Sequence, residues 1–358
     1  MISQLRYDSV RNLKPKTLSI NTNLCLFYGD NGAGKTSILE AIHILGTGRS
    51  FRTHQISQVI QKETKHLNCF CVLDSGDKVG VQRTTDNEYE IRINQESKNR
   101  LSILAEYLPV RVMTPESFLL LTSGAQSRRQ FLDFCVFHVE HSFANDWQTY
   151  GRILKQRNAL LKQGKGMESF QYWDNQLVPL IEKINTIRES TFNELIPYFN
   201  YYQTRFLPQY DVQYSLSKGM SDGDIQAQLE KSFESDKRYG FTTVGPHKAD
   251  VKVKINSDNA HQVLSRGELK MLVASLILGQ VKWLVDRGTM NYLLLDDLAS
   301  ELDTQKQDIV LQEIKQLPRL QTFVTAIQKP EYFQGLESKE YQMFHVEHGV
   351  LEEKQEND

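Results

Sequence analysis

A glycine-rich segment of eight residues constrains this chain more than any other feature. Residues 29–36 read Gly-Asp-Asn-Gly-Ala-Gly-Lys-Thr and fit the phosphate-loop pattern G-x-x-x-x-G-K-[ST] at every position. The apolar run at 24–28 predicts a strand before the loop, and residues 37–45 predict a helix after it. Strand, loop and helix in this order favour an α/β fold that binds a nucleotide through backbone amides and the helix N-terminus.

The loop also predicts which atoms contact the nucleotide. Lys35 would reach the β- and γ-phosphates of ATP, and the Thr36 hydroxyl would bind Mg²⁺. The expected ATP contacts on this side of the site are Gly29, Asp30, Asn31, Gly32, Ala33, Gly34, Lys35, Thr36 and Ser37, with Arg11 and Asn12 from an earlier turn. About one chain in a hundred of this length would match the pattern by chance, and the strand and helix around it lower that figure.

Composition limits the remaining classes of function. The 358 residues include 42 basic and 44 acidic side chains, so the whole surface does not attract nucleic acid or membrane. The four cysteines (Cys25, Cys69, Cys71 and Cys135) form no C-x-x-C pair, which argues against a zinc ribbon and favours free thiols in a reducing cytosol. Charged residues interrupt the N-terminal segment and no apolar run is long enough to span a bilayer. We therefore expect a cytoplasmic protein without membrane contact.

Periodicity outlines the rest of the chain. Residues 79–84 and 89–93 alternate as a hairpin does. Helical spacing is found at 147–161 and 177–195, and Arg157 falls on the apolar face of the first of these helices, so it should be buried and paired. The patterns predict strands at 241–244, 251–255 and 292–295 and a helix at 269–284.

A second motif supplies carboxylates. Residues 293–297 read Leu-Leu-Leu-Asp-Asp, a buried strand that ends in two acids. We expect Asp296 to hold Mg²⁺, usually through water. Asp297 is placed to polarise the attacking water and, with Lys35, forms the predicted catalytic pair; the alternative is that Asp297 is a structural carboxylate.

A third motif precedes these acids by about thirty residues. Ser265 and Glu268 form an S-x-x-E capping box, which taken alone indicates only a helix start. Followed by the acidic strand, residues 264–270 resemble the signature of ABC-type ATPases, and residues 300–303 resemble their D-loop. The resemblance implies that Ser265, Gly267 and Glu268 face the γ-phosphate of ATP bound to a second copy of the chain.

Taken together, the motifs resemble the RecF family over nearly the whole chain. The segments that carry this resemblance are 11–12, 46–52, 114–116, 128–133, 156–158, 245–250, 300–303 and Lys306. Two segments depart from the family pattern. Residues 123–125 replace a Gly-Ser-Pro-like turn. After Gly-Pro-His, Lys248 replaces an arginine and Ala249 replaces an aspartate, so the bidentate geometry of the arginine and one acid are lost.

The resemblance implies an α/β fold, namely a P-loop ABC-type ATPase head with a mostly helical second lobe. Lobe I would comprise residues 1–108 and 276–358, and lobe II residues 109–275. It also implies an ATP- and Mg²⁺-dependent homodimer that binds double-stranded DNA and double-strand/single-strand junctions. With RecR and RecO, such a protein promotes RecA loading at gaps during DNA repair, replication and the SOS response, and weak DNA-stimulated ATP hydrolysis resets it.

Two other functions remain as alternatives. A nucleotide-binding subunit of an ABC transporter would carry an aromatic residue before the loop, a Gln in the coupling loop and a switch His; here the last two positions are Glu116 and Thr325. A phosphate-loop enzyme acting on a small acceptor leaves residues 265–268 unexplained. Basic residues that could contact DNA, or simply be solvated, are Arg49, Arg52, Lys62, Lys65, Arg152, Lys155 and Lys162.

Overall fold

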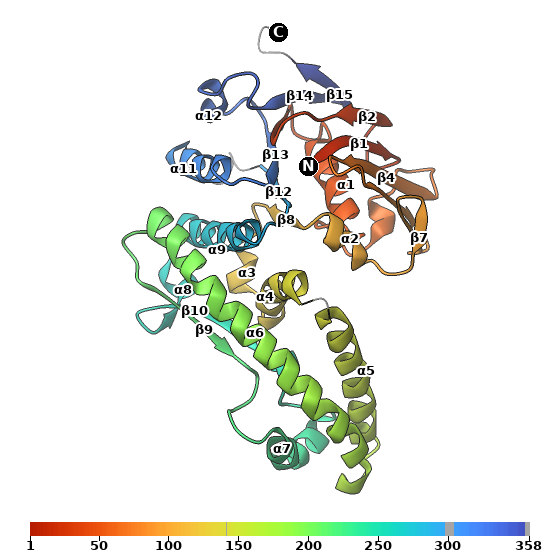
Figure 1. Ribbon diagram of the computed structural model, residues 1–358, viewed down its shortest axis with the longest axis vertical. Helices are drawn as coiled ribbons and strands as arrows, with labels where there is room; N and C mark the ends of the chain where they lie inside the picture. The colour runs from red at the N-terminus through yellow and green to blue at the C-terminus, as the bar shows by residue number, and fades with distance from the viewer. Residues whose placement is uncertain (141, 298–303, 355–358) are drawn as a thin grey trace. The chain divides into compact units, whose positions relative to one another are not determined.

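The computed structural model describes residues 1–140, 142–297 and 304–354 (Figure 1). The chain forms two compact units: Met1–Ser117 with Val281–Asp358, and Phe118–Gln280. Within the described ranges, none of the helices has the length and apolar character needed to cross a bilayer.

The first unit contains a six-stranded, mainly parallel sheet in the order β15-β14-β3-β13-β12-β8. In that order the strands are Val350–Lys354, Gln342–Glu347, Leu24–Tyr28, Leu320–Ala326, Asn291–Leu295 and Val110–Met113. All pairs are parallel except β14 with β15. Every residue of β12 and β13 is buried, as expected for strands covered on both faces. The strands predicted at 24–28 and 292–295 are confirmed. β8, which the prediction assigned to lobe II, extends this sheet beside β12.

An antiparallel sheet in the order β2-β1-β4-β5-β6-β7 forms the second layer of this unit. Its strands are Lys16–Ser19, Ile2–Asp8, His66–Leu73, Lys78–Thr84, Tyr89–Ile93 and Glu96–Lys98. The predicted hairpin is the antiparallel pair β5–β6. Helix α1 (Lys35–Thr47) contacts both sheets, and its apolar side chains belong to the same core as theirs. The first unit is completed by α2 (Ile103–Tyr107), α11 (Thr304–Lys315) and α12 (Glu331–Gln334).

The second unit is mostly helical. Its helices are α3 (Leu119–Thr122), α4 (Ala125–Val139), α5 (Phe143–Lys162), α6 (Gln171–Phe206), α7 (Ile225–Tyr239) and α8 (Ala260–Val263). A small antiparallel sheet has the order β11-β10-β9, with strands Asp258–Asn259, Asp250–Ile255 and Val212–Ser217. Helix α6 continues through Pro179 and Pro197. Helix α9 (Arg266–Asp286) begins in this unit and ends in the first.

A buried ion cluster joins three helices of the second unit. Arg157 on α5 has no exposed surface, and its guanidinium donates to Asp174 on α6 at 2.8 Å and to Asp236 on α7 at 2.9 Å. The prediction of a buried, paired Arg157 is therefore confirmed. Burial of three charges is tolerated because each one has an opposite partner.

The strand predicted at 241–244 is wrong, because this segment forms a loop. The polar groups of this loop form hydrogen bonds with side chains and not with a neighbouring strand. Thr243 donates its amide and hydroxyl to Asp236 at 2.8 and 2.6 Å, and Thr242 donates both groups to Asn158 at 2.8 Å. Side-chain acceptors of this kind compete with sheet pairing.

Candidate nucleotide-binding site

The sheet order brings the predicted site residues together. β13 lies between β3 and β12 and is parallel to both, with Ala326 opposite Tyr28 and Val324 opposite Leu295. The carboxyl ends of the three strands therefore meet at one edge of the sheet. The phosphate loop follows β3, Asp296 follows β12, and Thr325 is the next-to-last residue of β13.

Glycine is required at several positions of the phosphate loop. Gly29, Gly32 and Gly34 have φ angles of 146°, 81° and 120°, which L side chains rarely adopt. A Cβ on Gly29 would lie 2.2 Å from the carbonyl oxygen of Val346. Gly34 is the N-cap of α1 and has no side chain to cap the first amides, which leaves them available to an anion.

Lys35 is held inside the loop. Its Nζ donates to the carbonyl oxygens of Gly29 at 2.7 Å and Asp30 at 2.9 Å. An ammonium has three donors, so one remains for a phosphate oxygen. Burial lowers the pKa of Lys35, while the carboxylates of Asp297 and Asp296 oppose that shift. A phosphate would favour the charged form further.

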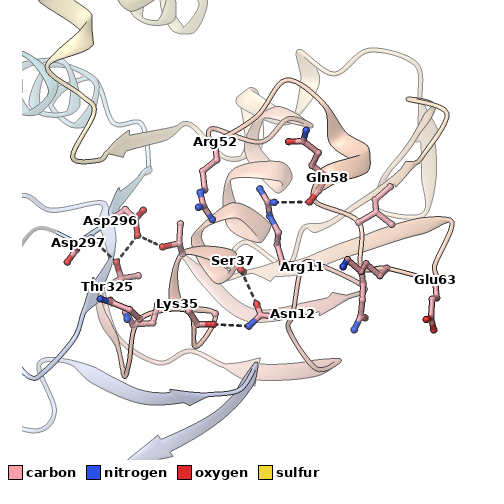
Figure 2. Close-up of a pocket in the computed structure, with 17 residues that line it drawn as sticks. Arg11, Asn12, Lys35, Ser37, Arg52, Gln58, Glu63, Asp296, Asp297 and Thr325 are labelled. Carbon is pink, nitrogen blue, oxygen red and sulfur yellow. Dashed lines mark hydrogen bonds between the residues drawn. The ribbon is translucent and has the colours of Figure 1, made fainter.

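Asp296 is the polar centre of the site. Its Oδ1 accepts the Thr36 hydroxyl at 2.8 Å and the Thr325 hydroxyl at 2.9 Å (Figure 2). Burial raises the pKa of Asp296, and these two hydrogen bonds and the charge of Arg52 oppose the shift. Asp297 lies beside it with a positive φ of 51°, and its amide donates to the Thr325 hydroxyl at 2.9 Å. Thr325 thus supports both acids.

The Thr36 and Asp296 oxygens fit a Mg²⁺ site. Adjacent ligands of an octahedral Mg²⁺ lie about 2.9 Å apart, given metal–oxygen distances of about 2.0–2.1 Å. The observed separation of 2.8 Å is that of an O–H···O hydrogen bond, so both oxygens lie close enough to bind one cation, directly or through its water. Among the described residues, no three His, Cys, Asp or Glu side chains gather as metal ligands. The remaining ligands would be water and phosphate oxygens, which is usual for Mg²⁺ at nucleotide sites.

A cavity of about 730 Å³ lies over these groups. The predicted residues that line it are Arg11, Asn12, Asn31, Gly32, Gly34, Lys35, Thr36, Ser37, Asp296 and Asp297. Gly29, Asp30 and Ala33 do not line it. Asn12 acts on the loop itself, since its Nδ2 donates to the Gly32 carbonyl at 3.1 Å and its Oδ1 accepts the Ser37 hydroxyl at 3.4 Å. Arg52 and Lys62, considered above as DNA contacts, also line the cavity.

The signature residues belong to the second unit and form a capping box at the start of α9. The Glu268 carboxylate accepts the Ser265 amide at 2.9 Å and its hydroxyl at 2.6 Å. The bond to the hydroxyl is the first cause of the lowered pKa of Glu268. A third bond, from the Tyr210 hydroxyl at 2.9 Å, fixes the same carboxylate. Among the described residues, none would come within 4 Å of a Cβ on Gly267, so packing against them does not require a glycine there.

Glu116 is exposed in the segment between β8 and α3 and does not line the cavity. Residues 300–303, expected as the D-loop, lie outside the described residues.

Comparison with known proteins identifies the family. Residues 1–352 match the family described as RecF/RecN/SMC N terminal domain. The DNA replication and repair protein RecF of Shewanella loihica is 41% identical over 353 residues, covering 97% of this chain and 98% of its own. The RecF of Shewanella sp. (strain MR-7) is 42% identical over 353 residues and covers 97% of each chain. The chain belongs to the RecF family.

Solved structures agree with the predicted fold class. The structure of the recombination mediator RecF with ATP in the RecFOR pathway has a TM-score of 0.86 and 24% identity, covering 99% of this chain and 97% of that one. A Smc head bound to the C-winged helix domain of ScpA has a TM-score of 0.60 and 14% identity, covering 99% and 98%. This RecF-family chain therefore has the ATPase-head fold of RecF and Smc. The predicted family is confirmed, and the transporter alternative has no support.

A buried carboxylate that the sequence analysis did not single out fixes one side of the cavity. Glu40 on α1 has no exposed surface and binds Arg11 through two hydrogen bonds of 2.8 and 2.9 Å. It also accepts the Ser50 hydroxyl at 2.5 Å and lies 3.9 Å from Arg52. Its signal was an acid among the apolar residues of the helix after the loop, where a buried charge needs a partner.

The backbone of Arg11 has a positive φ, and hydrogen bonds from its amide and its side chain hold it in this conformation. Arg11 has a φ of 51°, and its amide donates to the Val59 carbonyl at 2.7 Å. Its guanidinium also donates to the Gln58 carbonyl at 2.7 Å. With the two bonds to Glu40, these contacts use three of the five N–H groups of the guanidinium and hold it at the edge of the cavity, where the other two could donate to phosphate oxygens.

We expect Glu40→Gln to weaken ATP binding about 10-fold, because Arg11 loses its charged partner and is no longer held toward the phosphates. Titration with a fluorescent ATP analogue measures the effect, and thermal unfolding shows whether the variant folds. Glu63→Gln, at an exposed residue that lines the same cavity, is the matched control.

A double-mutant cycle isolates the role of Arg11. If Glu40 acts through Arg11, adding Glu40→Gln to Arg11→Ala will change the ATP affinity little further. Fully additive losses would contradict this role.

Proposed function

We propose that this RecF-family protein is an ATP- and Mg²⁺-dependent switch that acts on DNA in replication and repair. The observation that carries the proposal is the convergence of Lys35, Thr36, Asp296 and Thr325 at one sheet edge, under a cavity of about 730 Å³. Such an edge with a phosphate loop suits a nucleoside triphosphate. Lys35 would neutralise phosphate charge, and Thr36 and Asp296 would hold Mg²⁺.

The ATP-bound form in this proposal is a homodimer. The signature belongs to a different unit from the phosphate loop, and Gly267 leaves open space where another molecule could approach. The Ser265 hydroxyl can turn from Glu268 toward a phosphate while the Ser265 amide keeps its bond to that carboxylate. Ser265 and Gly267 of one copy would then contact the γ-phosphate held by the other, with Glu268 acting as the helix cap.

Hydrolysis would reset this switch. Asp297 is the residue proposed to orient the attacking water, because it follows the Mg²⁺-binding acid and its backbone is fixed by Thr325. Aspartate is one methylene shorter than the glutamate common at this position in ABC-type enzymes. We therefore expect slow ATP hydrolysis. We also propose that DNA binding stimulates it.

The names of the relatives support the proposed partners. Relatives at 41–42% identity are DNA replication and repair proteins, and a protein of similar fold acts in the RecFOR pathway. We infer binding of duplex DNA and of junctions with single strands, and cooperation with RecR and RecO in loading RecA. A cytoplasmic location agrees with this role.

The mass of the protein in solution tests the proposed dimer. Light scattering should show a monomer without nucleotide and with ADP, and a dimer with ATP and Mg²⁺. Ser265→Arg should bind ATP as tightly as the wild type in the monomer and fail to dimerise, because the added side chain fills the space meant for the phosphate. Ser235→Arg, at an exposed serine on α7, is the control and should still dimerise. Dimers of Ser265→Arg would refute the assignment of the signature.

Replacement of the second acid tests the hydrolytic step. Asp297→Asn keeps the shape of the side chain but removes the charge that would polarise water, so we expect an ATP-bound dimer that persists for many times the wild-type lifetime. Hydrolysis can be followed by phosphate release and the dimer by light scattering. Phosphate release at the wild-type rate would rule out Asp297 as the catalytic acid.

A further inference from the structure

A polar groove in the second unit contains two lysines whose charges are not balanced. The groove lies between the segment joining α3 to α4 and strand β10 and has a volume of about 390 Å³. The residues that line this groove all lie within Phe118–Gln280, and they differ from those that line the nucleotide cavity. Lys252 and Lys254 line it, and neither makes an ion pair with any residue that the structure describes.

The alternation of β10 directs these lysines to one face. Val251 and Val253 are buried, with 5% and 6% of their surface exposed, so the residues between them face the other way. Two residues along a strand correspond to about 7 Å. The neighbouring strand continues the polar face, since Lys252 is opposite Ser215 and Lys254 is opposite Gln213.

Among the lining residues that the structure describes, Asp250 is the only carboxylate, and its charge is already neutralised. Asp250 accepts two hydrogen bonds from Arg128, of 2.7 and 3.1 Å. Arg128 is held further by the Ser123 carbonyl at 2.7 Å. The pair therefore adds no net charge, and the groove carries the positive charge of Lys252 and Lys254.

We propose that this groove binds the phosphate backbone of duplex DNA, an inference that rests on the proposed function. Its lining offers ammonium groups with hydroxyl and amide groups from Thr122, Ser123 and Asn259, which are the usual partners of phosphate oxygens. A protein partner would need apolar anchors, but the valines that line the groove are buried in the sheet.

The contacts in this groove are independent of base sequence. Arginine reads guanine through a bidentate pair, but the fork of Arg128 is occupied by Asp250. Lysine acts on phosphate as a point charge. The groove therefore contributes affinity and position on the duplex without selecting a sequence.

The double variant Lys252→Ala/Lys254→Ala tests the groove in the full chain. Duplex binding is measured by fluorescence anisotropy over a range of salt concentrations, with ATP and Mg²⁺ present. Loss of two phosphate contacts should reduce the slope of log K against log salt by about 1.8 for each copy that contacts the duplex, or about 3.6 for the proposed dimer, and weaken binding at least 10-fold at low salt. The loss should be equal for two duplexes of unrelated sequence, and the ATP-dependent mass should match that of the wild type.

A charge-matched control separates a local effect from the loss of net charge. Lys231→Ala/Lys237→Ala removes two exposed lysines from α7 and should leave the slope unchanged. A wild-type slope in the groove variant, or an equal fall in the control, would overturn the proposal that the groove binds DNA and would leave the proposed function intact. Absence of duplex binding by the wild-type protein would overturn both.

Discussion

The nucleotide site depends on the parallel pairing of three strands. β13 joins β3 to β12, and only this order places the phosphate loop beside the acids that follow β12. The hydrogen bond from Thr36 to Asp296 links the loop to the acid, although the two residues are 260 positions apart in the sequence. A parallel sheet of this kind requires long crossover connections, and in this chain the whole second unit lies between β8 and β12.

Charge burial explains why a nucleotide would strengthen this site. Burial lowers the pKa of Lys35 and raises the pKa of Asp296, so it disfavours the charged form of each. In the proposed complex a triphosphate would supply negative charge to Lys35, and Mg²⁺ would supply positive charge to Asp296. Binding therefore relieves both costs, and ligand that binds only the folded state stabilises that state. Glu40 and Arg11 show the same principle inside the protein, since each is buried or half-buried against the other.

The sequence predicted features that follow from local pattern. The strand, loop and helix around residues 29–36, the acidic strand end at Asp296 and the buried Arg157 all leave a signal within a short window. Contacts that depend on distant partners left no such signal. Glu40 is visible as an acid in an apolar helix, but its partner Arg11 lies 29 positions away. The predicted strand at 241–244 failed because Asp236 and Asn158 satisfy its polar groups. The pairing of β8 with β12 could not be predicted, because the two strands lie far apart along the chain.

In the proposed dimer one copy of the chain contacts the triphosphate held by the other, and label transfer between the two copies is the decisive test. Wild-type protein is mixed with a larger, tagged copy that carries Lys35→Met, in the presence of Mg²⁺ and an ATP analogue with a photoreactive γ-phosphate. Because the tagged copy cannot hold nucleotide itself, we predict that light transfers the label to it, and that a further Ser265→Arg change abolishes the transfer. Label found only on the wild-type copy would show that the second copy does not reach the triphosphate.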